Sequence, residues 1–213
     1  MPFTFPKIYP ILDASYVPFE DRAAFLRKLG ESLTDAGVTL CEYRNKTGDE
    51  AQILADARIL RSAMPPQRVK LILDDRIDLV QQIEFDGVHV DDGDATPAEA
   101  RQLLGARFII GTFGGSDALI PGILRSPADY LSIGPIYQTR TKQTSKAPIG
   151  LAGIRNLREQ AGPDPVLVAV AGIALSTAAD ALEAGANVVA VSEALFRLPD
   201  PATEFRKWKA ELK

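Results

Sequence analysis

The sequence predicts a single (βα)8 TIM barrel, one domain that spans residues 1–213. Short, apolar, β-prone segments alternate along the chain with segments that have the apolar spacing of amphipathic helices. The apolar segments are typical of strands buried on both faces, as in parallel sheets that are covered by helices. No Ser/Gly-rich linker or change of composition divides the chain, so one domain is the economical interpretation.

Eight strand candidates follow one another, and a candidate helix follows each of them. The strands are expected at residues 8–12, 38–43, 69–73, 87–90, 108–112, 130–133, 166–170 and 188–191. The helices are expected near residues 20–35, 49–62, 76–84, 96–104, 116–124, 150–160, 175–184 and 201–211. Eight such units favour a closed barrel over an open doubly wound sheet, which stays an alternative because periodicity does not show closure.

Composition limits the partners of the chain. With 46% hydrophobic residues, the chain can bury a sizeable core. It has no apolar run of 18 residues and no basic-then-apolar start, so we expect no membrane span, no secretory signal and a cytoplasmic location. The net charge of −4 argues against nucleic acid as a partner. Cys41, the single cysteine, excludes an intrachain disulfide and is expected to be a buried strand thiol.

The segment GPIYQTRTKQTSKAPIG, residues 134–150, places hydroxyls and cations on one glycine-bounded loop. Its hydroxyl donors and cations are Thr139, Arg140, Thr141, Lys142, Thr144, Ser145 and Lys146. Both kinds of group suit a phosphate, and a solvated surface loop is the alternative. The loop joins the end of a strand to a helix, and barrel active sites lie at the C-terminal ends of strands. This position favours a phosphate site.

Acidic residues gather at two other strand ends. Asp74 and Asp75 end the third strand candidate, and Asp91, Asp92 and Asp94 follow the fourth. Mg²⁺ prefers oxygen ligands, usually one or two carboxylates with water and substrate phosphates. N-capping of a helix would also explain one aspartate alone, but facing groups of carboxylates repel each other unless a cation intervenes. Asp75 and Asp94 are therefore the candidate Mg²⁺ ligands.

Cations and a glycine at further strand ends suit a phosphorylated ligand. Arg44 and Lys46 alternate with Tyr43 and Asn45, so an extended strand end would send both cations to one side, where they could clamp a diphosphate. Surface cations that face solvent are the alternative. Gly172 leaves room for backbone N–H groups to approach an anion, although a tight turn alone would also explain it.

Seven segments are similar to one known family, in order and in spacing. They are IYPILD (8–13), EYRNK (42–46), LDDRIDL (73–79), FDGVHVDDGD (85–94), GPIYQTRTK (134–142), VAVAGI (168–173) and AGANVVAVSEALF (184–196). Over nearly its whole length the chain resembles the thiamine phosphate synthases. The resemblance implies an Mg²⁺-dependent barrel enzyme that joins an aminopyrimidine methyl diphosphate to a thiazole phosphate and releases pyrophosphate. Its partners would be these small molecules, and a homo-oligomer is compatible with the resemblance.

The resemblance also implies roles for individual residues. Asp75 and Asp94 would ligate Mg²⁺, while Arg44, Lys46 and Lys142 would hold the departing diphosphate and act in catalysis. The predicted substrate-binding residues are Glu42, Tyr43, Arg44, Asn45, Lys46, Asp74, Phe113, Thr139, Arg140, Thr141, Lys142, Gly172, Ser192 and Glu193.

Four positions depart from the family pattern. Glu42 stands where the family has a glutamine that contacts the pyrimidine, and Asp74 stands where it has an asparagine. Phe113 and Glu193 each replace a serine of the family. A carboxylate at position 42 can still accept a hydrogen bond from an exocyclic amine.

Two rival functions follow from these features. The first is a thiazole tautomerase, a sister enzyme on the same barrel that uses a histidine just after strand five, where this chain has Gly115. His89, the only histidine, lies on the fourth strand candidate and is expected to pack in the core. The second rival, motivated by the four departures, is a divergent barrel that binds a related phosphorylated ligand without turning it over.

Overall fold

The computed structural model, which describes residues 3–91, 93, 95–139 and 146–212, contains a closed barrel of parallel strands. The strands are β1 (Ile8–Asp13), β2 (Leu40–Arg44), β3 (Lys70–Asp74), β4 (Gly87–Val90), β5 (Ile109–Gly115), β6 (Tyr130–Ile133), β7 (Leu167–Ala169) and β8 (Val188–Val191). Each strand pairs with the next, and β8 pairs with β1, where Ile8 lies opposite Val189. This last pairing confirms the predicted barrel and excludes the open sheet.

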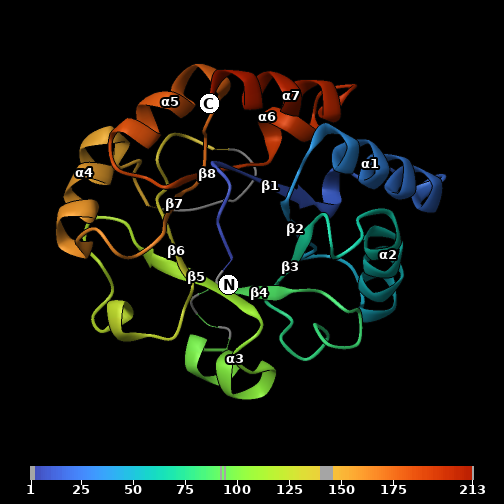
Figure 1. The fold of residues 1–213 in the computed structure, drawn as a ribbon, viewed down its shortest axis with the longest axis horizontal. Helices are drawn as coiled ribbons and strands as arrows, with labels where there is room; N and C mark the ends of the chain where they lie inside the picture. The colour runs from blue at the N-terminus through green and yellow to red at the C-terminus, as the bar shows by residue number, and fades with distance from the viewer. Residues whose placement is uncertain (1–2, 92, 94, 140–145, 213) are drawn as a thin grey trace.

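Helices surround the barrel (Figure 1). The α-helices are α1 (Arg22–Ala36), α2 (Glu50–Ala63), α3 (Pro97–Leu104), α4 (Gly150–Ala161), α5 (Leu175–Glu183), α6 (Glu193–Phe196) and α7 (Pro201–Glu211), and the 3₁₀ turns are η1 (Ala14–Tyr16) and η2 (Ile123–Arg125). Side-chain caps fix several of their starts. Asp49 accepts from Gln52 N at α2, and Thr96 and Glu99 form a capping box at α3.

The helix that the sequence predicts near residues 76–84 does not form. The backbone hydrogen bonds of this segment alternate between three- and four-residue closures, as in Leu79 N to Arg76 O and Ile83 N to Leu79 O. The segment therefore forms a series of turns in place of a regular helix.

The helix predicted near residues 116–124 is also wrong. The chain there forms an isolated antiparallel bridge between Gly115 and Leu119 and then only the short η2 turn. Pro121 has no backbone N–H to donate, and Gly122 adopts a left-handed φ of 80°. Both residues interrupt a helix at this point.

The barrel has two separate apolar cores. The inner core consists of Tyr9, Leu40, Ile72, Ile109, Tyr130, Val168, Val188 and Ala190, and the larger outer core lies between the strands and the helices. Phe3 and Phe5 pack on the inner core from the segment before β1, and this segment crosses the middle of the ring of strands (Figure 1). The N-terminal end of the barrel is thereby covered, so the C-terminal mouth is the end that can receive a ligand.

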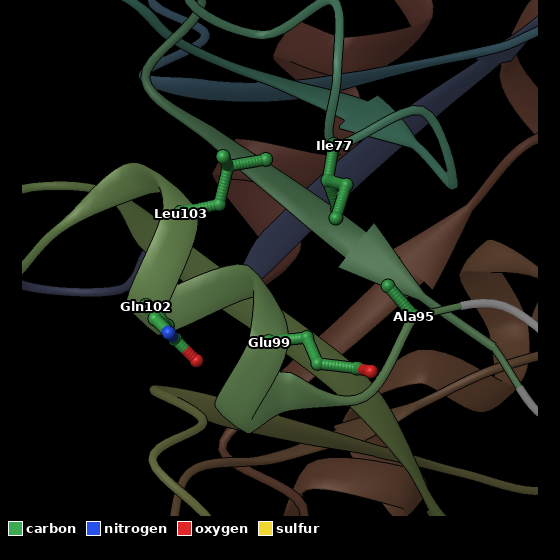
Figure 2. A pocket seen from close by; sticks show the side chains of 5 residues that line it. All are labelled: Ile77, Ala95, Glu99, Gln102 and Leu103. Atoms are coloured by element: carbon green, nitrogen blue, oxygen red, sulfur yellow. The ribbon is translucent and has the colours of Figure 1, made fainter.

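An open hollow lies outside the barrel, between the 77–84 turns and α3. Ile77, Ala95, Glu99, Gln102 and Leu103 line this hollow. Figure 2 shows side chains from both segments around it, with Ile77 opposite α3. Among the described residues, its lining includes none that the sequence predicts for substrate or metal.

Two further sequence expectations concern Cys41 and the membrane. Cys41 is a free, buried thiol on β2, as predicted, and burial raises its pKa to about 12. Within the described residues, no helix combines the length and the apolar character that crossing a bilayer requires.

Candidate active site

Charged side chains from three neighbouring strands meet at the C-terminal mouth of the barrel. Asp13, Arg44 and Asp74 are the last residues of β1, β2 and β3. The Arg44 guanidinium donates from Nη1 to Asp13, and its Nε lies 3.6 Å from Asp74 Oδ2. Lys46 Nζ lies 3.1 Å from Asp74 Oδ2 and also donates to Asp75. The mouth therefore alternates three carboxylates with two cations.

Four of these five residues were predicted from the sequence, and the fifth, Asp13, was missed. The sequence feature that could have identified Asp13 is an acidic residue at the end of an apolar strand, which is the same pattern that pointed to Asp74. Burial raises the pKa of the Asp13 carboxyl, but hydrogen bonds from Ser15 and Arg44 outweigh burial and leave the pKa below its usual value. Asp13 is thus ionised at neutral pH and holds the Arg44 guanidinium in place.

The β3 end offers an oxygen ligand for a cation. Asp75 has a left-handed φ of 65°, and its N–H donates to His89 O at 2.8 Å. Its Oδ1 is buried without a hydrogen-bond partner among the described residues, which fits a position for a metal. Among the described residues, no group of three or more His, Cys, Asp or Glu side chains could hold a metal, and Asp94, the second predicted ligand, lies outside those residues. Mg²⁺ often takes only one or two carboxylates beside water and phosphates, so Asp75 fits it.

Below the mouth, inside the barrel, lies a hydrogen-bonded cluster of Tyr9, Glu42, His89 and Tyr130, here called the polar floor. Tyr9 Oη donates to Glu42 Oε2 at 2.7 Å and lies 3.0 Å from Tyr130 Oη. Tyr130 Oη lies 3.0 Å from His89 Nδ1, and the two rings stack. Gly111 makes room for this arrangement, because a Cβ there would lie 1.9 Å from the Tyr130 ring. The four side chains are buried and form the bottom of the site.

The surroundings of the polar floor raise the pKa of all four of its members, and Glu42 and His89 are the two that titrate nearest to neutral pH. Burial raises the pKa of Glu42 to about 7, and the charge of Asp74 adds to this effect, against the opposing influence of His89 and Tyr9. Burial lowers the pKa of His89, but the hydrogen bond with Asp91 and the charge of Glu42 outweigh it, so the net shift is upward. Near neutral pH, a proton is therefore retained at the bottom of the site.

This arrangement predicts how the free energy of unfolding depends on pH. Below about pH 4.5, Glu42 is protonated in both states; between pH 4.5 and 7, the folded protein keeps a proton that the unfolded chain has released. Stability from this group is therefore present at low pH and lost as pH rises through about 7. The difference in the free energy of unfolding between Glu42→Gln and wild type should therefore grow in favour of the variant from pH 5 to pH 8, by on the order of 3 kcal/mol.

Urea unfolding of wild type and Glu42→Gln at pH 5, 6, 7 and 8 measures this difference. The control is Glu31→Gln on the exposed side of α1, which should follow the wild-type pH dependence. Parallel stability profiles for wild type and Glu42→Gln would contradict a proton held by Glu42.

The polar floor was only partly visible in the sequence. His89 is buried and stacked, as predicted for a packed strand residue, but its hydrogen bond to Tyr130 was not foreseen. Tyr9 and Tyr130 were missed. The sequence feature that could have identified them is a tyrosine inside an apolar strand. A buried tyrosine hydroxyl usually has a hydrogen-bond partner, so such a residue indicates a polar contact in the core.

Two residues of the EYRNK segment lie differently from the prediction. Tyr43 is buried on the face of β2 that packs against the helices, and its hydroxyl donates to Asp56 of α2. Alternation along the strand sends Glu42 and Arg44 inward and Tyr43 outward. Asn45 donates to the Tyr43 hydroxyl and accepts from the next turn. The Tyr43 side chain therefore points away from the barrel interior, whereas Glu42 and Arg44 point into it.

The loop after β6 approaches the end of β7. Tyr137 N donates to Ala171 O at 3.1 Å. Gly172 has a φ of 68°, and a Cβ there would lie 2.5 Å from Gln138 O. Close packing of this loop, together with the left-handed backbone, is what requires glycine. Thr139 is half-buried beside this contact, whereas the predicted residues Arg140, Thr141 and Lys142 lie outside the described residues, as do Thr144 and Ser145.

The far end of the same loop returns to β5. Phe113 is half-buried and alternates with Ile109 and Gly111, so it faces the barrel interior near the mouth. Lys146 Nζ lies 4.1 Å from the centre of the Phe113 ring, a cation–π contact. Phe113 thus supplies a contact to the loop at a position where the family has a serine.

The β8 end contributes a hydroxyl and a carboxylate. Ser192 precedes α6, but its Oγ does not cap this helix and is buried without a hydrogen-bond partner among the described residues. Glu193 Oε1 lies 3.0 Å from Arg197 Nη1. This ion pair offsets the charge of Glu193 where a phosphate is expected.

Comparison with known proteins shows the family of this chain. The family model for thiamine monophosphate synthase matches residues 8–195. The chain belongs to this family. It is 37% identical over 203 residues to a thiamine-phosphate synthase of Koribacter versatilis, with 94% of each chain covered. It is 34% identical to one of Chloroflexus aurantiacus, with 96% of this chain and 91% of the other covered.

Solved structures agree in fold. Thiamine phosphate pyrophosphorylase from Pyrococcus furiosus superimposes with a TM-score of 0.76 at 23% identity, covering 97% of this chain and 95% of that one. The four departures at Glu42, Asp74, Phe113 and Glu193 thus occur in a member of the family with its barrel intact.

Proposed function

We propose that this protein is a thiamine-phosphate synthase, which joins an aminopyrimidine methyl diphosphate to a thiazole phosphate and releases pyrophosphate. The observation that carries the proposal is the convergence of Arg44 and Lys46 on the carboxylates of the β3 end, above a buried polar floor. Cations at the mouth suit a diphosphate, and the floor suits a flat ring with donor and acceptor atoms. The substrates are small molecules, and we place the reaction in the cytoplasm.

The proposed chemistry breaks the bond between the pyrimidine methyl carbon and the diphosphate oxygen. The bonding electron pair leaves with pyrophosphate, and the lone pair of the thiazole nitrogen forms the new C–N bond. Arg44 and Lys46 stabilise the charge that develops on the leaving group. Asp75 would hold Mg²⁺, which adds positive charge beside the diphosphate when it is bound.

The departure at position 42 is compatible with this function. A glutamine side chain both donates and accepts hydrogen bonds, and a protonated carboxyl does the same. Burial raises the pKa of Glu42 to about 7, so a large fraction of Glu42 is neutral at physiological pH. Glu42 can therefore make the kinds of hydrogen bond that the glutamine of the family makes.

Gly115 argues against the tautomerase alternative. This residue stands where that enzyme would need a histidine; its φ is 145°, and a Cβ would lie 2.1 Å from Ala118 O. A side chain does not fit here without a shift of the backbone. A barrel that only binds its ligand would not need the array of charges at the mouth, so the synthase is the better-supported proposal.

The test is an assay with aminopyrimidine methyl diphosphate, thiazole phosphate and Mg²⁺. We expect thiamine phosphate and pyrophosphate to appear in equal amounts, and both to be lost with EDTA. A folded protein that binds the two substrates but forms neither product would contradict the synthase and favour the binding-only barrel.

A further inference from the structure

A second polar network lies on the outer side of β2, behind the mouth. Arg22 of α1 donates from Nε and Nη2 to both carboxylate oxygens of Asp56 on α2, at 2.6–3.0 Å. The Tyr43 hydroxyl donates to Asp56 Oδ2 at 2.5 Å and accepts from Asn45 Nδ2 at 3.0 Å. Tyr43 is fully buried, and Asp56 is 2% exposed. Four side chains thus form one continuous chain of hydrogen bonds from α1 to the loop after β2.

The donors in this network run in one direction. The Asn45 amide donates to the Tyr43 hydroxyl, the hydroxyl donates to the Asp56 carboxylate, and the Arg22 guanidinium balances the charge of that carboxylate. Burial and the bond to Asp56 both raise the pKa of Tyr43, so the hydroxyl keeps its proton and remains a donor. Each hydrogen bond of the network can therefore form only with these donor and acceptor roles.

Asn45, at the end of this network, fixes the turn that contains Lys46. Asn45 Oδ1 accepts from Thr47 N at 3.2 Å and from Gly48 N at 2.7 Å. Because the oxygen accepts from two backbone N–H groups, the Asn45 amide must point its nitrogen at Tyr43. The turn also packs closely on this side chain, since a Cβ at Gly48 would lie 2.3 Å from Asn45 Nδ2. Backbone on both sides of Lys46 is therefore held by one side chain.

Burial does not hold Lys46 itself. Its side chain is 35% exposed, and it forms ion pairs with Asp74 and Asp75. A lysine has many rotamers, and fixing one at a surface costs conformational entropy. The position of its backbone therefore decides how often Nζ lies beside the β3 carboxylates.

We propose that Tyr43 and Asp56 are positioning residues, which hold Lys46 over the β3 carboxylates through the side chain of Asn45. The inference rests on the proposed function, because it assigns the network to a residue that would bind the departing diphosphate. It also gives Tyr43 a role opposite to the one that the sequence suggested. Tyr43 acts from behind the strand and does not touch substrate.

Tyr43→Phe removes the hydroxyl link and keeps the ring. Asn45→Ala breaks the same link from the loop side, at a half-buried position where loss of the fold is not expected. The control is Thr34→Val, which also deletes a buried hydroxyl, bonded to Gly30 O and Ala63 O at the other end of the barrel. Urea unfolding of all three variants measures how much stability each one loses.

Two measurements detect positioning. Limited trypsin digestion of the native protein reports cleavage after Lys46, identified by mass spectrometry. Calorimetric titration with pyrophosphate and Mg²⁺ reports binding at the mouth. We expect both cleavage rate and pyrophosphate Kd to rise about five- to tenfold in Tyr43→Phe and Asn45→Ala, as for loss of one hydrogen bond. Thr34→Val should leave both at the wild-type value.

Four outcomes are informative. Wild-type cleavage and Kd in both network variants would overturn the inference, and so would equal increases in all three variants, because the network would then be merely structural. If wild type forms no thiamine phosphate, the proposed function fails, and the cleavage measurement still decides the positioning role. If wild type is active and the network variants cleave at its rate, the positioning inference alone fails.

Discussion

Replacing Asp75 by asparagine should reduce Mg²⁺-dependent formation of thiamine phosphate on the order of 1000-fold, equivalent to about 4 kcal/mol of transition-state stabilisation. Within the part of the chain that the structure describes, the Oδ1 atom of this side chain is buried without a hydrogen-bond partner, at the mouth that Lys46 also reaches. An amide keeps the shape but removes the negative charge that a cation needs. The measurement is kcat/KM at saturating Mg²⁺, with pyrophosphate binding by calorimetry in parallel.

Asp78→Asn is the matched control for this prediction. Asp78 lies three residues further along, is exposed, and pairs with Arg76 outside the mouth. It should retain wild-type activity. Full activity in Asp75→Asn would refute the assignment of Asp75 to the metal, whereas equal losses in the two variants would indicate a general effect on the 75–84 segment.

Replacing Arg44 by lysine should lower kcat/KM about 100-fold, equivalent to about 3 kcal/mol, although the charge is conserved. The planar guanidinium spans two strands, because it donates to Asp13 on β1 while its Nε lies near Asp74 on β3. A lysine ammonium is a point charge and does not occupy both positions in one orientation. We also expect the free energy of unfolding to fall, since Asp13 would lose its guanidinium partner and, among the described residues, keep only the hydrogen bond from Ser15.

The control is Arg68→Lys, an exposed arginine that precedes β3 at the opposite end of the barrel and pairs with Asp35. Steady-state kinetics and urea unfolding compare the two variants. Wild-type kcat/KM in Arg44→Lys would show that only the charge matters, and it would remove the guanidinium geometry from the proposed mechanism.

Much of the fold could be predicted from the sequence because parallel strands covered by helices are continuously apolar. The barrel was correct, and Arg44, Lys46, Asp74 and Asp75 were expected together because the carboxyl ends of parallel strands meet at one edge. The error near residues 116–124 was avoidable, since Pro121 and Gly122 are visible in the sequence. The turns at residues 77–84 were not, because their apolar spacing resembles that of a helix.

The direction of individual side chains required the structure. Tyr43 belongs to a motif at the mouth, yet strand alternation turns it toward the helices, where Asp56 accepts a hydrogen bond from its hydroxyl. From the sequence alone, adjacent residues of one motif look equivalent. Which of them faces the barrel is fixed only when the register of β2 against its neighbours is known.

The sequence by itself determined the order of strands, the family and the charged residues at the strand ends, because these depend on local pattern and on motifs. Only the tertiary structure decided the polar floor. Tyr9 and Tyr130 are 121 residues apart, and their hydroxyls meet because closure of the barrel brings β6 across from β1. Burial at that meeting point then raises the pKa of Glu42, since the cost of removing a carboxylate from water depends on surroundings that no single segment contains.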